Sequence, residues 1–405
     1  MSEQKQQKKT ALAPRLRFPE FREAGEWIAK ELKDACDVNP ANSELPKKFV
    51  YIDLESVESG ELKTRKITNR DDAPSRAQRL LRYGDVIFQI VRPYQRNNLL
   101  FKIDEDVHYV ASTGYAQFRA NESEDFLFQA VHTDDFVERV IAKCTGSSYP
   151  AINSSDLAKI PIAIPRYAEQ QIIAACLSSL DDLIAAQNQK LDALKTHKKG
   201  LMQQLFPRDG ETVPCLRFPE FRDAGEWEEK SVGKVFSITR GEVLAMPQVK
   251  EIPSEDFPYP VYSSQTKNNG LAGYFSRYLY KNAITWTTDG ANAGEVNFRQ
   301  GKFFCTNVCG VLLNSNGWAN PFVAALLNSV TRKYVSYVGN PKLMNGVMSE
   351  IVVPFPSLPE QQTIAACLSS LDDLIAAQSQ KIDALKRHKK GLMQQLFPVM
   401  DEVRA

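Results

Sequence analysis

The sequence predicts a mixed α/β protein in which two similar globular domains alternate with two long helices. Two repeats lead to this prediction. A 39-residue block occurs at Glu169–Pro207 and again at Glu360–Pro398, with only four differences. A shorter block, LRFPEFREAGEW, begins at Leu16 and returns at Leu216 as LRFPEFRDAGEW. The long segments between these blocks resemble each other only faintly. The chain therefore has a constant frame, formed by the repeated blocks, and two variable segments between them.

Each copy of the 39-residue block has the spacing of a coiled-coil helix. Its seam residues recur at alternating intervals of three and four over about four heptads. We predict that the two copies pair as an antiparallel coiled coil, which gives a pseudo-two-fold architecture. The alternative is that each helix packs separately on its own domain. The expected interface residues are Leu177, Leu180, Ile184, Gln187, Leu191, Leu194, Leu201 and Leu205 in the first copy, and Leu368, Leu371, Ile375, Gln378, Ile382, Leu385, Leu392 and Leu396 in the second.

Local signals place the ends of these helices. Ser357–Glu360 has the S-x-x-E form of a capping box, in which the two side chains satisfy backbone groups of the first turn. Pro207 and Pro398 end the two helices, because proline cannot continue a helix. Gly200 and Gly391 interrupt otherwise strong helix-forming sequence, and we interpret them as points of close approach or bending.

The two variable segments share a skeleton of strands. Apolar residues alternate at 160, 162 and 164 and again at 351, 353 and 355, which predicts a strand before each long helix. Leu81–Ile87 and Tyr278–Ile284 each have the pattern of a turn that enters a buried strand. The predicted organisation is a disordered N-terminus at 1–15, a first domain at 16–166, a first helix at 167–207, a second domain at 208–356, a second helix at 357–398 and a tail at 399–405.

Polar loops differ most between the two segments. They occupy residues 91–98 and 145–150 in the first segment, and 262–270, 287–294 and 339–346 in the second. Their Arg, Lys, Asn, Gln, Ser and Thr side chains suit base edges and phosphates, although ordinary solvated turns have a similar composition. The candidate DNA-binding residues are Arg92, Tyr94, Gln95, Arg96, Asn97, Ser147, Ser148, Tyr149, Ser263, Ser264, Gln265, Lys267, Asn268, Thr287, Thr288, Asn292, Lys342 and Asn345.

Composition and missing motifs narrow the classes of function. The 405 residues carry a net charge of +1, so any basic surface must be local. Seven cysteines, an odd number, fit a reducing cytoplasm, and no apolar run is long enough to suggest a membrane span. Walker A, N/D-P-P-Y/F, zinc-site and G-x-S-x-G patterns are all missing from the sequence. We therefore expect no catalytic site and no metal site.

Three short motifs carry a family resemblance. They are the LRFPEF openings, the LPEQQ sequence at Leu358–Gln362 that enters a long helix, and the HKKGLMQQLFP ending at His388–Pro398. With these motifs the chain resembles the DNA-specificity subunit of type I restriction–modification systems, from about Leu16 to Pro398. The first helix departs from the pattern, because Tyr167-Ala168 stands where the second copy has Leu-Pro.

The resemblance implies a function for each part of the chain. Each variable segment would be a target recognition domain that reads one half of a split, asymmetric double-stranded DNA site, and the paired helices would set the gap between the halves. The chain would bind no cofactor of its own. Its partners would be two methyltransferase subunits, which bind S-adenosylmethionine, and two restriction/translocase subunits, which use ATP and Mg²⁺. The alternative is a coiled-coil scaffold that bridges other proteins without binding DNA. A gel shift with random duplex DNA and the methyltransferase subunit would distinguish the two.

Overall fold

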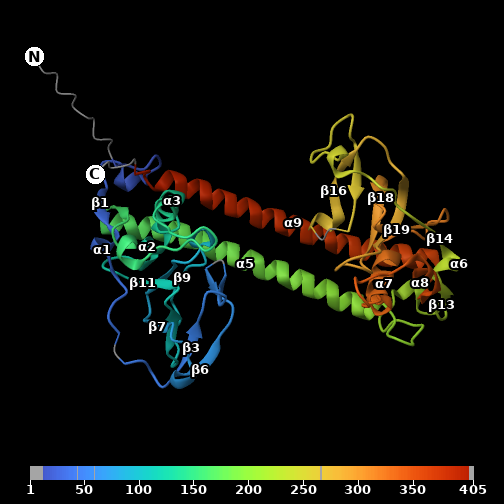
Figure 1. The fold of residues 1–405 in the computed structure, drawn as a ribbon, viewed down its shortest axis with the longest axis horizontal. Helices are drawn as coiled ribbons and strands as arrows, with labels where there is room; N and C mark the ends of the chain where they lie inside the picture. Colours follow the sequence, from blue (N-terminus) through green and yellow to red (C-terminus); the bar gives the residue numbers. More distant parts are fainter. Residues whose placement is uncertain (1–11, 43, 59, 265–266, 401–405) are drawn as a thin grey trace, which may run out of the picture. The chain divides into compact units, whose positions relative to one another are not determined.

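The computed structural model describes residues 12–42, 44–58, 60–264 and 267–400, which form two compact units. Unit 1 comprises residues 1–188 and 381–405, and unit 2 comprises residues 189–380. The two longest helices, α5 (Tyr167–Leu205) and α9 (Leu358–Leu396), therefore each contribute to both units (Figure 1).

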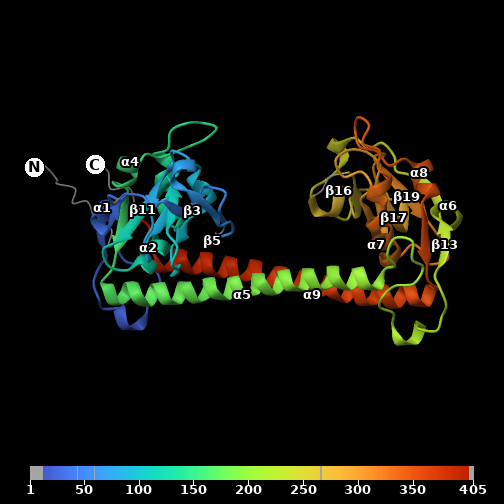
Figure 2. The same cartoon turned by 90° about the horizontal axis from the view of Figure 1, so that it is seen from below.

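Unit 1 combines two four-stranded sheets with short helices. One sheet has the order β6-β3-β10-β7 and the other has the order β2-β11-β8-β9, and two smaller ladders pair β1 with β12 and β4 with β5. In Figure 2 these strands lie to one side of α5. The strands are β1 (Ile28–Glu31), β2 (Cys36–Val38), β3 (Lys48–Ile52), β4 (Val57–Glu58), β5 (Glu61–Leu62), β6 (Lys66–Asn69), β7 (Ala77–Leu80), β8 (Val86–Gln89), β9 (Leu99–Leu100), β10 (Tyr109–Ser112), β11 (Tyr115–Ala120) and β12 (Pro161–Ile164). The shorter helices are η1 (Pro19–Phe21), α1 (Leu32–Ala35), η2 (Arg70–Asp72), η3 (Pro93–Gln95), α2 (Glu124–Ala130), α3 (Asp134–Ala142) and α4 (Ser154–Leu157).

Unit 2 is built on one six-stranded sheet of order β14-β19-β17-β18-β15-β16, with β13 and β20 paired separately. Its strands are β13 (Glu228–Ser231), β14 (Ser237–Arg240), β15 (Tyr259–Tyr262), β16 (Leu271–Phe275), β17 (Tyr280–Thr287), β18 (Val296–Cys305), β19 (Cys309–Leu313) and β20 (Val352–Phe355). Its helices, besides parts of α5 and α9, are η4 (Pro219–Phe221), α6 (Val232–Val235), η5 (Met246–Gln248), η6 (Lys267–Gly270), α7 (Pro321–Val330), η7 (Thr331–Tyr334) and α8 (Asn345–Glu350). Strands β12 and β20 confirm the strand predicted before each long helix.

The two units repeat one strand arrangement in matching register. The order β2-β11-β8-β9 in unit 1 corresponds to β14-β19-β17-β18 in unit 2. Val86 pairs with Phe118 and Leu100, and its counterpart Ile284 pairs with Leu312 and Phe298. The residues of one domain can therefore be matched to those of the other by position in the sheet, even where their sequences differ.

Each unit also has the same kind of hydrophobic core. In unit 1, Trp27 lies near Phe126 and near Phe397, which follows α9. In unit 2, Trp227 packs in one core with Phe206, which follows α5, and with Phe322 of α7. The start of one long helix and the end of the other thus complete each core.

The long helices run antiparallel within each unit. In unit 1, Lys389 of α9 bonds to Asp181 of α5 at 2.6 Å. In unit 2, Lys198 of α5 bonds to Asp372 of α9 at 2.5 Å. All the predicted interface residues are buried or partly buried, whereas most other positions along the helices are exposed. This is the pattern expected of an a/d seam.

The predicted capping box is wrong, and so is the interpretation of two glycines as points of close approach. The capping box is not formed, because both oxygens of the Glu360 carboxylate accept hydrogen bonds from Arg217 and Trp227 instead. Gly200 and Gly391 are not points of close approach, since a Cβ added at either residue would meet nothing within 4 Å. Both glycines lie inside continuous helix.

Candidate nucleic-acid interface

Two polar loops of unit 1 are joined by backbone hydrogen bonds. The loop after β8 and the loop between α3 and α4 meet where Val91 pairs with Ala151. The Arg92 N–H donates to Pro150 O at 2.7 Å, and the Ile152 N–H donates to Ile90 O at 3.1 Å. The second of these loops closes on itself through paired bonds between Thr145 and Ala151. It projects on the side of the unit away from α5 (Figure 2).

Unit 2 repeats this junction bond for bond. Its loop after β17 meets the loop between η7 and α8 where Asp289 pairs with Lys342. The Gly290 N–H donates to Pro341 O at 2.9 Å, and the Leu343 N–H donates to Thr288 O at 2.9 Å. The Ser336–Lys342 pair closes the second loop as Thr145–Ala151 does in unit 1. We call residues 90–98 with 145–151 the first loop pair, and residues 288–294 with 336–342 the second loop pair.

The first loop pair presents aromatic and cationic groups together. The Arg92 guanidinium lies 4.2 Å from the centroid of the Tyr149 ring, a cation–π arrangement. Tyr149 is 65% exposed, and Tyr94, Ser147 and Ser148 are exposed as well. Arg92 has a left-handed backbone with φ of 55°, a conformation that costs about 1–3 kcal/mol in a non-glycine residue. The structure therefore brings together candidates that lie more than 50 residues apart.

Three other candidates in this loop are held by neighbouring groups. Arg96 bonds to Asp134 Oδ1 at 2.6 Å and to His132 O at 3.1 Å, so its guanidinium joins the loop to α3. The Asn97 N–H donates to Gln89 Oε1, and Gln95 Oε1 accepts from Gln89 Nε2. These contacts give Arg96 and Asn97 a role in shaping the loop, whereas no carboxylate of the described residues is bonded to Arg92.

Some candidates of unit 2 are likewise buried or bonded within the loops, and others lie at or near the surface. Thr288 is fully buried and Thr287 nearly so, and the Thr288 hydroxyl lies 3.0 Å from Val308 O, so both residues support the loop from within. Asn292 Nδ2 donates to Ser264 O at 3.1 Å, and Thr306 Oγ1 bonds to Ser263 Oγ at 3.0 Å. Three further candidates lie at or near the surface of this region: Asn268, Lys342 and Asn345. Gln265 and the Lys267 side chain lie outside the described residues.

A histidine that sequence analysis left unassigned lies beneath the first loop pair. His132 Nδ1 is 2.6 Å from Phe128 O, and its Nε2 is 3.1 Å from Asn98 Nδ2. A neutral ring that donates from Nδ1 and accepts at Nε2 satisfies both contacts. Burial lowers the pKa of His132 to about 4, assisted by the charges of Lys389 and Arg96 and opposed by the Phe128 hydrogen bond and by Asp181.

This lowered pKa predicts acid sensitivity of unit 1. Between about pH 6.5 and 4 the unfolded chain binds a proton that the folded His132 does not, so stability falls as pH falls through this window. Between pH 7 and pH 4.5 the parent protein should lose free energy of unfolding. The His132→Gln variant should lose less, by on the order of 2 kcal/mol. Urea unfolding at the two pH values measures this loss, and His108→Gln, at an exposed histidine, is the control. Parallel losses in the variant and the parent protein would contradict the prediction.

Sequence analysis also missed a duplicated ion-pair clamp. Arg17 makes two hydrogen bonds of 2.7 Å to the Glu169 carboxylate, which also accepts from Trp27 Nε1 at 3.2 Å. Arg217, Glu360 and Trp227 repeat this arrangement with the same distances. Both carboxylates are only 1% exposed. The repeat of LRFPEF and EQQ in the two halves was the available signal, since each clamp joins one block to the other.

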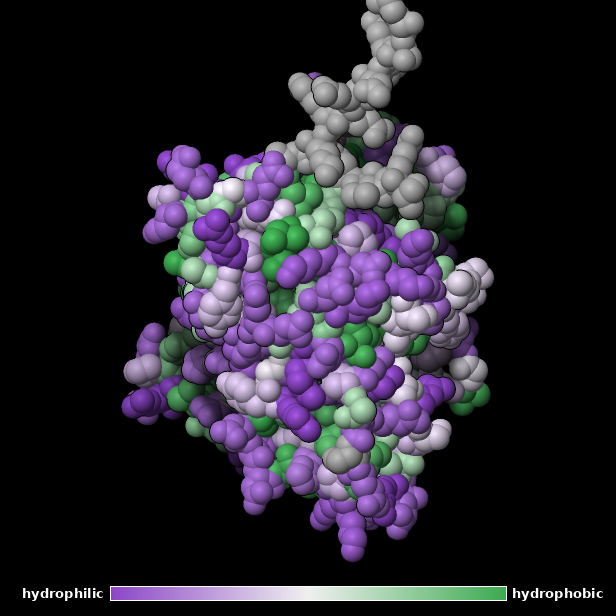
Figure 3. Space-filling model, turned by 90° about the vertical axis from the view of Figure 1, so that its left-hand side faces the viewer, coloured by the Kyte–Doolittle hydropathy of each residue, from purple (hydrophilic) through white to green (hydrophobic). Residues whose placement is uncertain are grey.

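The described residues show no second kind of site. Within the described ranges, no group of three or more His, Cys, Asp or Glu residues could hold a metal ion. None of the helices among those residues has the length and apolar content to cross a membrane. On the face of unit 1 shown in Figure 3, hydrophobic residues are scattered among hydrophilic ones and form no single large patch.

Comparison with known proteins agrees with this geometry. The family model described as "Type I restriction modification DNA specificity domain" matches the chain twice, at residues 25–196 and 224–387. The chain belongs to this family. It is a DNA specificity subunit with two recognition domains, and each match contains one loop pair.

Relatives belong to the same family, and a solved structure shares the fold. The putative type I specificity subunit S.MpnORF289P N-terminus of Mycoplasma pneumoniae is 42% identical over 139 residues, which are 34% of this chain and 73% of that protein. The putative subunit S.MpnORF285P of the same organism is 34% identical over 171 residues, which are 41% of this chain and 55% of that protein. A type I S subunit from M. genitalium shares the fold with a TM-score of 0.61 at 16% identity, over 96% of this chain and 100% of that one.

Proposed function

We propose that this specificity subunit reads a split duplex-DNA target, with one half-site for each recognition domain. The observation that carries the proposal is the repeated junction of the two loop pairs, which keeps its backbone hydrogen bonds while its side chains change. A constant backbone with variable side chains is suited to presenting two different sets of hydrogen-bonding groups. The two half-sites should therefore differ in sequence.

The first domain would contact DNA through Arg92 and the aromatic residues beside it. Arg92 offers a planar guanidinium fork that fits acceptors on bases and phosphates. Tyr149 fixes that fork by stacking, and Tyr94 adds a second exposed aromatic side chain with a hydroxyl group. In the second domain, Asn268, Asn292 and Lys342 would supply amide and ammonium groups. Lys342 lies 4.0 Å from Asp289, a separation that leaves its ammonium group able to exchange this partner for a phosphate.

The chemistry would belong to partner subunits. We infer that the chain itself is not catalytic and that it acts in the cytoplasm with two methyltransferase subunits and two restriction/translocase subunits. S-adenosylmethionine, ATP and Mg²⁺ would be cofactors of those partners. A second solved structure with the same fold has a TM-score of 0.55 and covers 92% of this chain, and it comes from work on assembly and conformational transition of a type I system. This likeness supports the proposed assembly.

Reconstitution tests the proposal directly. The purified chain should transfer no methyl group from S-adenosylmethionine to DNA, whereas the chain with its methyltransferase subunit should methylate one split motif. Sequencing of the modified bases identifies that motif. Methylation by the isolated chain would contradict the non-catalytic assignment, and a complex that methylates without sequence preference would contradict target recognition.

A further inference from the structure

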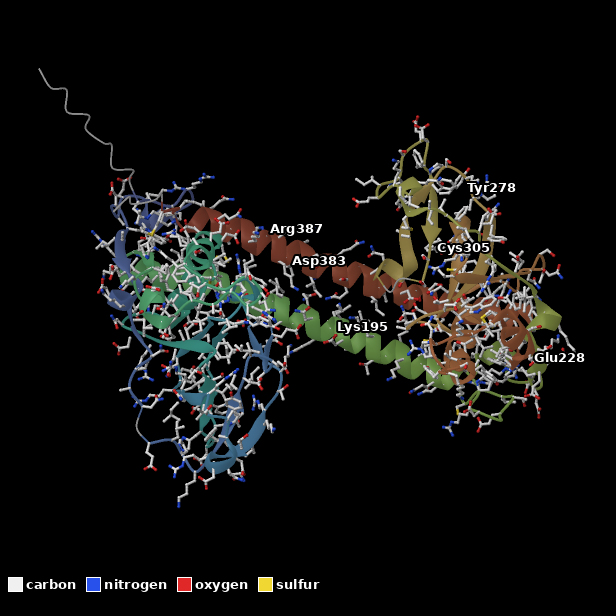
Figure 4. The ribbon with its side chains drawn as sticks, viewed as in Figure 1. Lys195, Glu228, Tyr278, Cys305, Asp383 and Arg387 are labelled. Atoms are coloured by element: carbon white, nitrogen blue, oxygen red, sulfur yellow. The ribbon has the colours of Figure 1, made fainter. Side chains whose placement is uncertain are left out.

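A small group of polar residues lies on one face of the sheet of unit 2. Thr285 and Asn297 are paired across β17 and β18, and Arg299 follows on the same face opposite Ala283. Arg299 Nε donates to Thr285 Oγ1 at 3.0 Å, and its guanidinium lies 3.9 Å from the centroid of the Tyr262 ring. Cys305, labelled in Figure 4, is a buried residue of β18 in the interior of this sheet.

No carboxylate of the described residues is bonded to Arg299. The side chain is 8% exposed, yet within the described part of the chain it makes no ion pair, and its two Nη atoms make no hydrogen bond. Each Nη atom retains some contact with solvent, because neither is a buried atom that lacks a partner. Burial lowers the pKa of Arg299, which shows that the environment disfavours its charge. The structure thus holds an oriented guanidinium fork whose two outer donors are unused.

The duplicated domain shows that the fold does not need polar groups at these positions. By sheet register, Thr285, Asn297 and Arg299 correspond to Ile87, Leu99 and Phe101 of unit 1. Those three residues belong to one apolar cluster and are at most 6% exposed. An apolar cluster fills this place in unit 1, so the strand arrangement shared by the two units does not itself require a buried arginine here.

A partly buried arginine of unit 1 shows what a structural role looks like. Arg119 makes two bonds of 2.9 Å to Asp85, and Gln117 Nε2 donates to the same carboxylate at 2.7 Å. Asp85 is fully buried, and its charge is matched. Among the residues that the structure describes Arg299 has no such partner, so the two arginines play different roles in their domains.

Arg299 also lies next to the candidate loops of unit 2. Its guanidinium lies over the ring of Tyr262, the residue that immediately precedes Ser263 and Ser264 in the sequence. Asn292 Nδ2 donates a hydrogen bond to Ser264 O at 3.1 Å. Residues 296–349 contain five Lys or Arg residues and no Asp or Glu, so the surrounding sequence favours an anionic partner. The free Nη donors therefore belong to the same region as the groups proposed to meet DNA.

We propose that Arg299 is a specificity-determining residue that reads a guanine in the second half-site by donating its two Nη groups to O6 and N7. This inference rests on the proposed function. A guanidinium held by stacking and by a fixed hydrogen bond suits this bidentate contact. A phosphate contact is less suitable, because the phosphate backbone is common to both half-sites, whereas Arg299 has an apolar counterpart in the first domain.

The test uses the complete chain with its methyltransferase subunit. Arg299→Met and Arg299→Lys should each lower discrimination at one guanine of the second half-site by roughly 5- to 150-fold, with the first half-site unchanged. Sequencing of methylated DNA reports the motif, and competition binding with duplexes that vary at each position reports the discrimination. Since Arg299→Met removes an unmatched buried charge, its melting temperature should equal or exceed that of the parent protein.

Controls separate this role from the alternatives. Arg277→Met removes an exposed arginine that is bonded to Glu242 in the same unit, and it should leave the motif intact. A uniform loss of affinity for all sequences, with a salt dependence reduced by about one charge, would indicate a phosphate contact and overturn the guanine assignment. An unchanged motif in both Arg299 variants would overturn it as well. If the parent complex itself shows no split motif, the proposed function fails, and that outcome is distinguishable from both.

Discussion

Glu360→Gln is expected to lower the free energy of unfolding of unit 2 by about 3–5 kcal/mol. The Glu360 carboxylate is 1% exposed and accepts three hydrogen bonds, two from Arg217 and one from Trp227. An amide retains the shape but removes the negative charge, so the mostly buried Arg217 guanidinium loses its counterion. The clamp holds the start of α9 against the segment that opens the second domain, so its loss should weaken the whole core of unit 2.

Three companion variants make the clamp prediction specific. Glu229→Gln removes an exposed carboxylate from the same unit and should have an effect within about 0.5 kcal/mol of zero. The double variant Arg217→Met/Glu360→Leu should be more stable than Glu360→Gln, because no buried charge is left unpaired. Glu169→Gln should reproduce the loss in unit 1, where the clamp is duplicated. Urea unfolding measures all four, and a Glu360→Gln protein as stable as its parent would show that the ion pair contributes little.

Replacing residues 28–165 with the corresponding segment of a relative is expected to change one half of the methylated motif completely. The replaced segment contains the whole first loop pair, whereas Trp27 and Glu169 remain with the constant frame. Its two ends are adjacent in space, because Ile28 of β1 pairs with Ile164 of β12. The exchange therefore transfers both strands of the β1–β12 ladder and leaves both ion-pair clamps intact.

The packing of unit 1 sets the condition for this exchange. Phe126 and Phe136 of the replaced segment lie in one core with Trp27 and Phe397 of the frame, so the donor segment needs apolar residues of similar size at these positions. Methylome sequencing of a host that expresses the hybrid with its methyltransferase subunit gives the motif. The second half-site should be retained, and the parental subunit is the control. A motif that changes in both halves would show that the domains do not read DNA independently.

Repeats and spacing made much of this fold predictable. The heptad pattern identified the seam of α5 and α9, and the alternating apolar residues identified β12 and β20, because these patterns depend on the local geometry of one helix or strand. The local pattern gave a wrong prediction at Glu360. The S-x-x-E sequence fits a capping box, but the carboxylate accepts hydrogen bonds from Arg217, which is distant in the sequence.

The roles of individual loop residues were harder to predict. Arg92 and Arg96 are four positions apart in one polar loop, and the sequence offers no reason to separate them. The structure places Arg96 against Asp134 and stacks Arg92 on Tyr149. Thr288 is of a residue type suited to contacts with bases and phosphates, but it is fully buried. Exposure and hydrogen-bond partners come from distant segments, so composition alone cannot assign them.

The sequence by itself determined the duplicated architecture, the two long helices and the family, because each of these is written in repeats and motifs that can be read along the chain. Only the tertiary structure decided which side chains are available to a ligand. Arg299 shows this most clearly: it belongs to a strand that sequence analysis did not consider, and it becomes a candidate only when its unused donors are seen beside Tyr262 and compared with the apolar Phe101 of the other domain. The availability of a charged group depends on the partners that folding brings to it, and those partners lie far away in the sequence.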